Sequence, residues 1–455
     1  MTTSEQAFLV NTTVQSSDDT STSLFDTAEF LHLPRMEDAG GIPVPAAPEN
    51  LQQTGVSADI LRDLALKLGN TVPNFTTEWA TEKLCLPLQL VEELCWQLKQ
   101  DKLVEVLGQQ GPFSHKYAVS TRGREQAHRL MEFSGYIGPA PVSLESYCEM
   151  LEWQSAQRPQ IEMEEVQAAI SSLVLPEDAV SVAALAAASG RSLFLFGPPG
   201  NGKTSVGKLL HGVMTGDMWI PHCIVAGSGS IIRLYDSQCH KLVSETSNSK
   251  ARADGRWLRV HRPFVVAGGE MTMAELDLAY SPSLRFYEAP PHMKANGGTF
   301  LIDDFGRQRI APEELLNRWI IPLEHRIDHF TLHTGQKIQL PFRLMLIVAT
   351  NLSVSDVADP AFLRRMGYRL HLGRPTVEDY RNIFTRYAEK YGINVNPELL
   401  DWLLERYESE SRELRASEPR DLIERARDVC QLQGKPLELT KDVMKVAWVG
   451  YFGNM

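Results

Sequence analysis

Eight consecutive residues of this 455-residue chain have the types and spacing that hold a nucleotide triphosphate. They are Gly197, Pro198, Pro199, Gly200, Asn201, Gly202, Lys203 and Thr204, and Ser205 follows them. The glycines let backbone N–H groups converge on phosphate oxygens, and the start of the next helix adds partial positive charge. Lys203 can reach the outer phosphates, and the Thr204 hydroxyl can ligate Mg²⁺. The sequence therefore predicts that residues 197–205 bind a nucleotide.

Two later apolar runs end in polar residues that suit the hydrolysis of such a nucleotide. The run 297–302 ends in Asp303 and Asp304. Asp303 is predicted to hold Mg²⁺, and Asp304 to orient or deprotonate the water that attacks the terminal phosphate. The run 344–350 ends in Asn351, predicted to contact that phosphate or the water. A strand-ending Asp pair alone is also common in turns and helix caps, so the prediction depends on the phosphate loop.

Arginines further along supply candidate cations. Arg364 and Arg365 are adjacent, where they could stabilise charge on a nucleotide held by a neighbouring subunit, and Arg365 is preferred. Either could instead form an ordinary salt bridge. Arg420, near a predicted helix start, could reach back to the phosphates of its own chain. Three other arginines compete for that role, namely Arg415, Arg425 and Arg427.

These residues need a scaffold of buried strands. The short apolar run 192–196 precedes the phosphate loop and a helical pattern follows it, which is typical of an α/β fold with a parallel sheet. After Pro375 the pattern is helical to the C-terminus, with Thr376 as a helix cap, and residues 375–455 are predicted to form a helical lid.

Composition bounds the class of protein. The net charge is −12, and the first fifty residues hold eight acidic residues against Arg35 alone. We expect residues 1–50 to be a disordered acidic tail, because such a composition cannot offset its ordering entropy by burial. Six cysteines form no C-x-x-C pair, and no apolar run approaches the length that spans a bilayer. A cytoplasmic protein is expected.

Residues 51–135 show three helical patterns and then a glycine-containing hairpin, which favours a winged-helix domain. Between residues 59 and 132 there are nine basic and ten acidic residues, so the positive surface that DNA binding needs is missing. A role in binding protein is preferred over one in binding DNA. Residues 136–157 are predicted to be a stiff linker and a helix.

Together, the phosphate loop, the carboxylate-ended strand, Asn351, the arginine pair and Arg420 resemble the AAA+ ATPases over residues 161–451. The resemblance implies a P-loop αβα domain of AAA+ type at 158–374, with a strand-rich insertion at 227–296 and a hairpin at 330–340. Those two additions are similar to the MoxR-like branch, which includes bacterial ATPases with possible chaperone activity.

The resemblance also implies Mg²⁺-dependent ATP hydrolysis, a homo-oligomer that is expected to be a hexameric ring, and a protein client. One residue departs from the family pattern, since Asp304 stands where Glu is usual, and this predicts slow turnover. Two other functions stay open: a DNA-associated motor or regulator that uses the winged helix, and a slowly hydrolysing, nucleotide-switched scaffold.

Overall fold

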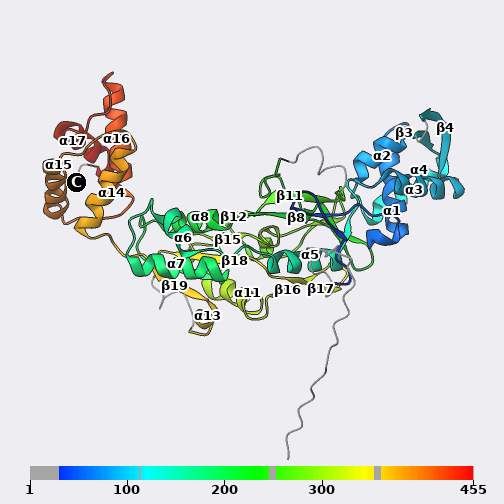
Figure 1. Cartoon of the computed structure of the whole chain (residues 1–455), viewed down its shortest axis with the longest axis horizontal. Coiled ribbons are helices and arrows are strands. Elements are labelled where there is room, and N and C mark those ends of the chain that lie inside the picture. Colours follow the sequence, from blue (N-terminus) through cyan, green and yellow to red (C-terminus); the bar gives the residue numbers. More distant parts are fainter. Residues whose placement is uncertain (1–29, 112–113, 245–252, 353–359, 454–455) are drawn as a thin grey trace, which may run out of the picture.

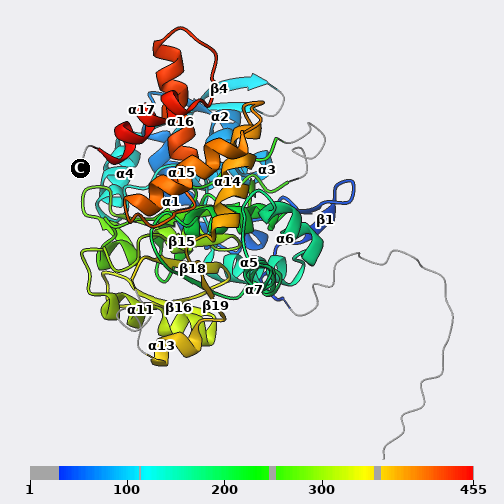
Figure 2. The same ribbon diagram turned by 90° about the vertical axis from the view of Figure 1, so that its left-hand side faces the viewer.

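The computed structural model describes residues 30–111, 114–244, 253–352 and 360–453. Three bodies follow one another along its long axis (Figure 1): the N-terminal helices, a central body that contains the parallel sheet, and the C-terminal helices. Figure 2 views the molecule along that axis, from the end that carries the C-terminal helices. No helix in these described ranges is long and apolar enough to cross a membrane.

The N-terminal segment is ordered in part, which corrects the prediction that residues 1–50 are disordered. Strands β1 (Met36–Asp38) and β2 (Pro43–Pro45) form an antiparallel hairpin. Val44 is only 2% exposed, and Nε1 of Trp219 donates to the carbonyl oxygen of Pro43 at 2.9 Å. The tail's composition is polar, but burial against a distant part of the chain offsets the entropy of ordering these few residues. Residues 1–29 lie outside the described residues.

The next unit contains the helices and hairpin expected from the sequence. Its helices are α1 (Ala58–Gly69), α2 (Thr77–Leu84), α3 (Leu88–Gln100) and α4 (Thr121–Phe133). Its antiparallel sheet has the order β3 (Phe75–Thr76), β5 (Ser114–Val119) and β4 (Val104–Gly111). The Thr76 hydroxyl accepts a hydrogen bond from the Trp79 amide at 3.2 Å, which fixes the start of α2. The winged-helix role of this unit stays a prediction.

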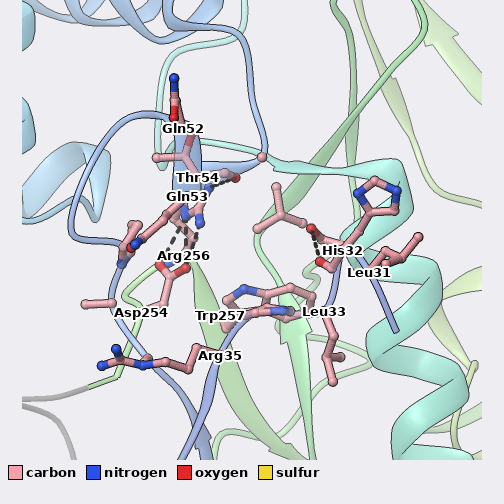
Figure 3. Close-up of a pocket in the computed structure, with 17 residues that line it drawn as sticks. Leu31, His32, Leu33, Arg35, Gln52, Gln53, Thr54, Asp254, Arg256 and Trp257 are labelled. Carbon is pink, nitrogen blue, oxygen red and sulfur yellow. Dashed lines mark hydrogen bonds and ion pairs between the residues drawn. The ribbon is translucent and has the colours of Figure 1, made fainter. Parts of the chain in front are cut away.

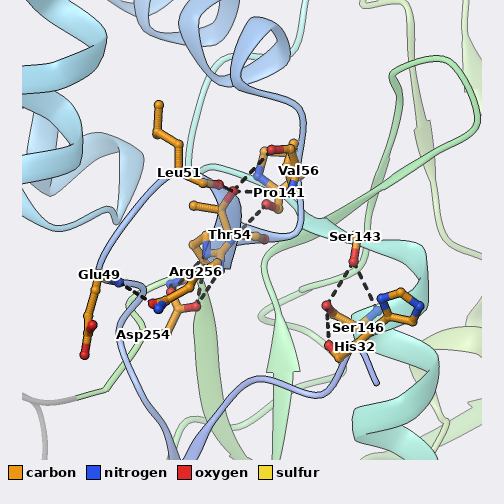
Figure 4. A network of polar contacts seen from close by, with 11 residues as sticks. His32, Glu49, Leu51, Thr54, Val56, Pro141, Ser143, Ser146, Asp254 and Arg256 are labelled. Carbon is orange, nitrogen blue, oxygen red and sulfur yellow. Dashed lines mark hydrogen bonds and ion pairs between the residues drawn. The ribbon is translucent and has the colours of Figure 1, made fainter. Parts of the chain in front are cut away.

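A buried ion pair holds both ends of this unit to the central body (Figure 4). Nη2 of Arg256 lies 2.7 Å from Oδ2 of Asp254, and the two side chains are 3% and 1% exposed. Nη1 of Arg256 also donates to the carbonyl oxygens of Thr54 and Pro141, which lie before and after the unit. Because every charge here is paired and hydrogen-bonded, its burial is compensated. A pocket of about 320 Å³ lies beside the pair, and Arg35, Asp254 and Arg256 are among the residues that line it (Figure 3).

The central body is built on a five-stranded parallel sheet. Its order is β12 (Phe264–Ala267), β15 (Thr299–Ile302), β18 (Met345–Thr350), β7 (Leu193–Phe196) and β19 (Tyr368–His371). Every neighbouring pair is parallel. The carboxyl ends of all five strands therefore meet at one edge of the sheet, which is where ligands bind in such folds.

Helices cover both faces of this sheet, which explains why its strands are apolar at successive positions. One face carries α6 (Met163–Ile170), α7 (Glu177–Ser189) and α8 (Lys203–Val213), and the other carries α11 (Pro312–His325) and α13 (Pro360–Arg365). Successive residues of β7 alternate between the two cores, with Leu193 and Leu195 in the first and Phe194 in the second. The predicted fold class is confirmed: the chain contains an αβα sandwich of the P-loop type.

Strand β12 corrects the predicted insertion at 227–296. It lies within those residues, yet Phe264 pairs with Thr299 of β15, so β12 belongs to the central sheet. A strand's partner is set by distant residues, and a local apolar pattern does not reveal it.

On either side of β12, residues 227–296 do form extra strands, which are β10 (Ser230–Arg233), β11 (Trp257–His261), β13 (Ala279–Ser281) and β14 (Phe286–Glu288). Two more extra strands, β8 (Asp217–Pro221) and β9 (Cys223–Ala226), precede the predicted insertion. A second sheet has the order β13-β14-β10-β9-β6, in which β6 (Val142–Ser143) comes from the linker just before α5 (Leu144–Ala156). A hairpin, β16 (Ile327–Thr331) and β17 (Lys337–Pro341), lies where one was predicted at 330–340.

The C-terminal body consists of helices α14 (Val377–Glu389), α15 (Pro397–Ser409), α16 (Glu418–Leu432) and α17 (Lys441–Phe452). Thr376 caps α14 as predicted, because its hydroxyl accepts from the Asp379 amide and the Asp379 carboxylate accepts from the Thr376 amide. Buried aromatic side chains join the helices, with Tyr407 and Trp448 in edge-to-face contact.

Candidate nucleotide-binding site

The phosphate loop lies between β7 and α8, at the carboxyl edge of the central sheet. Three of its glycines have positive φ: 138° at Gly197, 82° at Gly200 and 84° at Gly202. A Cβ on Gly197 would lie 2.2 Å from the carbonyl oxygen of Leu372, so no other residue fits there. The chain therefore turns tightly enough to present the N-terminal amides of α8 at the sheet edge, where they can bind an anion.

Lys203 opens α8 and reaches back over this loop. Its Nζ donates to the carbonyl oxygens of Gly197 at 2.8 Å and Pro198 at 2.9 Å, and the residue is 7% exposed. Burial lowers the pKa of Lys203, and the carboxylates of Asp304 and Asp303 oppose that shift. The ammonium is thus held over the loop and faces two acidic side chains.

The two residues predicted to hold Mg²⁺ are in direct contact. The Thr204 hydroxyl donates to Oδ2 of Asp303 at 2.8 Å. Among the described residues, no group of three His, Cys, Asp or Glu could form a metal site by itself. One carboxylate and one hydroxyl nevertheless fit Mg²⁺, which prefers oxygen ligands and is usually shared between one or two protein groups, water and phosphates.

Asp304 and Asn351 also meet, at the ends of β15 and β18. Nδ2 of Asn351 donates to Oδ1 of Asp304 at 2.8 Å. Asp304 has φ of 49°, a left-handed conformation that Asp and Asn tolerate better than most residues. The chain is fixed there because the Phe305 amide donates to the Ala349 carbonyl oxygen at 2.8 Å. The backbone therefore directs the Asp304 carboxylate towards Asn351, at the same edge of the sheet as the phosphate loop.

The C-terminal helices contact the phosphate loop directly. The Ser417 amide donates to the Gly200 carbonyl oxygen at 2.8 Å, and the Ala416 amide donates to Oδ1 of Asn201 at 3.3 Å. A pocket of about 270 Å³ lies at this junction, and Arg420 lines it together with Gly200, Asn201, Gly202 and Ser205. Arg420 therefore lies near the loop, where it pairs with Asp421 at 2.8 Å. Its contact with the phosphates stays a prediction.

The competing arginines lie differently. The Arg415 side chain lies beside Gly200, since a Cβ built on Gly200 would be 3.6 Å from it. Arg425 donates to the Asp421 carbonyl oxygen, and Arg427 pairs with Glu424. Other residues of the pocket wall belong to no motif and could not be found from the sequence pattern: Ser172, Leu173, Val174, Leu175, Ile383, Arg386, Tyr387 and Lys390.

Arg364 and Arg365 lie at the opposite edge of the sheet. They end α13 just before β19, and β19 runs parallel to β7 with Tyr368 beside Leu193. The phosphate loop follows the other end of β7, so the two arginines and the loop are separated by the length of the strand. Nε of Arg365 lies 2.9 Å from Oε2 of Glu324, the ordinary salt bridge that the sequence left open.

Comparisons with known proteins place few constraints on function. The family model described as "Domain of unknown function (DUF8689)" matches residues 376–449, and no curated protein matches the chain. Similar solved structures include the RuvB Holliday junction branch migration motor of Thermotoga maritima, with 16% identity, a TM-score of 0.33, and 64% of this chain and 71% of that chain covered. NtrX of Brucella abortus in complex with ADP has 16% identity and a TM-score of 0.38, covering 72% and 66%. The fold follows from the sheet order itself.

Proposed function

We propose that this chain is a Mg²⁺-dependent ATPase of AAA+ type. The observation that carries the proposal is the meeting of three features at one edge of the parallel sheet. They are the phosphate loop with Lys203, the contact between Thr204 and Asp303, and the contact between Asp304 and Asn351. The hydroxyl and carboxylate of the second feature are ligands for Mg²⁺, and the third feature offers a base with its orienting amide.

In this proposal the loop amides and Lys203 bind the phosphates of ATP and compensate their charge. Asp304 accepts a proton from the attacking water, and Asn351 holds the Asp304 carboxylate in place. The water oxygen then bonds to the terminal phosphorus as the bond to the bridging oxygen breaks, which yields ADP and inorganic phosphate. Mg²⁺, held by Thr204 and Asp303, would supply charge that neutralises the leaving phosphate oxygens.

We further propose that Arg364 and Arg365 act on the nucleotide of an adjoining copy. They lie at the sheet edge opposite their own phosphate loop, and a residue supplied from one copy to the next requires a head-to-tail contact, which closes into a ring. A hexamer of MoxR-like type that remodels a protein client is the form we favour. The N-terminal unit, in which acidic and basic residues nearly balance, would bind that client.

The test is phosphate release by the purified full chain with ATP and Mg²⁺. Lys203→Ala is the matched control, because it removes the only lysine of the loop, and chelation of Mg²⁺ should abolish release as well. Calorimetry should show that the wild-type chain binds ATP with Mg²⁺ and that the control does not. Absence of both binding and release would refute the proposal.

A nucleotide-switched scaffold is the second candidate, and the short Asp304 side chain favours it. A scaffold would bind ATP and assemble. In the time in which a motor hydrolyses many ATP molecules per copy, a scaffold would release less than one phosphate per copy. Single-turnover and steady-state rates on the same sample separate the two functions.

A further inference from the structure

Four arginine side chains gather in one pocket at the sheet edge opposite the phosphate loop. The pocket has a volume of about 340 Å³ and includes the strand ends before β7 and β19. Its arginines come from three separate segments of the chain and are Arg191, Arg326, Arg364 and Arg365. Only Arg364 and Arg365 are neighbours in sequence, so the cationic site is formed by folding and is not visible as a sequence motif.

Among the described residues that line it, the pocket has an excess of positive charge. Glu324 pairs with Arg365 and is 49% exposed, and within the described ranges no ion pair is made by the side chains of Arg191, Arg326 or Arg364. Burial lowers the pKa of Arg326, and the nearby cations Arg343 and Arg191 lower it further. A partly buried guanidinium among like charges is unfavourable unless an anion joins it.

The backbone at Arg326 supports the same conclusion. Arg326 follows the last turn of α11 with φ of 58°, the left-handed conformation that usually belongs to Gly. An L-residue with a Cβ loses about 1–2 kcal/mol in this conformation. A residue kept there against that cost is a candidate for a role of its side chain.

We propose that Arg191 and Arg326 join Arg364 and Arg365 in a pocket that receives the terminal phosphates of the nucleotide held by the adjoining copy. The inference rests on the proposed function and extends the adjacent pair to four residues. Guanidinium groups from several directions match the oxygens of a polyphosphate, with which each can make paired hydrogen bonds.

The pocket cannot serve the nucleotide of its own chain. Arg191 lies before β7 and the phosphate loop lies after it, and a strand of four residues is about 13 Å long. The phosphates must therefore come from a second copy, placed head to tail so that its phosphate loop faces this edge.

The experiment uses mixed oligomers of two full-length variants. The double variant Arg191→Gln, Arg326→Gln keeps its phosphate loop but lacks the two new cations. The variant Lys203→Ala keeps all four arginines but lacks its own nucleotide site. Alone, each should release phosphate roughly 100-fold more slowly than wild type. Mixed, they should regain hydrolysis well above the sum of the two, because intact loops then meet intact pockets.

Two further variants separate a local role from misfolding. Arg326→Gly removes the side chain but relieves the left-handed backbone, so its unfolding temperature should not fall while its hydrolysis does. Arg124→Gln removes an exposed arginine of α4, far from the pocket in sequence and on another body, and should behave as wild type. ATP affinity measured by calorimetry on dilute, dissociated copies should be unchanged in the double variant.

The inference is overturned if the double variant hydrolyses ATP like wild type, or if mixing gives only the sum of the two rates. If the wild-type chain itself releases no phosphate, the proposed function fails. The pocket is then tested by its binding of tripolyphosphate. Tripolyphosphate should bind the Lys203→Ala chain at low salt and lose that binding when Arg191 and Arg326 are also replaced. Equal binding by the two chains would overturn the inference by itself.

Discussion

Replacement of Asp304 by Asn tests the chemistry of the site with little change in its structure. Asn tolerates the left-handed φ of 49° found at this residue. The side-chain oxygen of the new Asn can still accept the hydrogen bond that Asn351 donates to Asp304 at 2.8 Å in the wild-type chain. What the substitution removes is the negative charge and the ability to accept a proton from water.

The expected loss follows from that single change. A positioned general base contributes roughly 10²–10⁴-fold to a rate, which corresponds to about 2.7–5.4 kcal/mol of activation free energy. Binding of ATP should stay the same or become tighter, because the loop and Lys203 are untouched and one negative charge near the phosphates is lost. Single-turnover phosphate release measures the first effect, and calorimetry with ATP and Mg²⁺ measures the second.

Asp304→Glu is the matched comparison. Glu keeps the charge, but a longer side chain in left-handed backbone gains no local hydrogen bonding, so the unfolding temperature should fall slightly. Hydrolysis should remain well above that of Asp304→Asn. A rate for Asp304→Asn within about threefold of the wild-type rate would refute the assignment of Asp304 as the base, since another residue would then accept the proton.

Other predictions concern stability and the contact between the C-terminal helices and the phosphate loop. Asp254→Asn leaves its buried arginine partner unpaired and should lower the free energy of unfolding by about 3–5 kcal/mol in thermal melts, whereas Asp401→Asn, in an exposed pair, should change it by less than about 1 kcal/mol. Asn201→Ala removes the acceptor for the Ala416 amide, so hydrogen exchange of that amide should become roughly fivefold faster or more; an unchanged rate would mean that Asn201 does not anchor the C-terminal helices. Burial lowers the pKa of His211 to about 4, below its ordinary 6.5, so the folded state favours neutral His211. The stability it provides is complete above pH 6.5 and is lost as the pH falls towards 4, and His211→Gln should flatten the melting temperature across that range.

Local pattern was sufficient wherever a short stretch carries its own signal. Glycine spacing identified the phosphate loop, and the apolar runs before Asp303 and Asn351 identified β15 and β18. The helices of residues 58–133 followed from the helical patterns there, and the cap at Thr376 followed from the threonine that precedes the last helical region. In each case the physical cause lies within a few residues, so the sequence reveals it.

Long-range contacts decided the remainder. Strand β12 belongs to the central sheet only because β15 lies beside it, and Val44 is ordered only because a distant surface buries it. Arg191 and Arg326 are unremarkable in the sequence and become part of a cationic pocket through the packing of α11 and β7. The sequence by itself thus determined the chemical groups of the candidate site and the class of fold. Which of those groups face one another, and at which edge of the sheet, depended on pairing and burial between segments far apart in the chain.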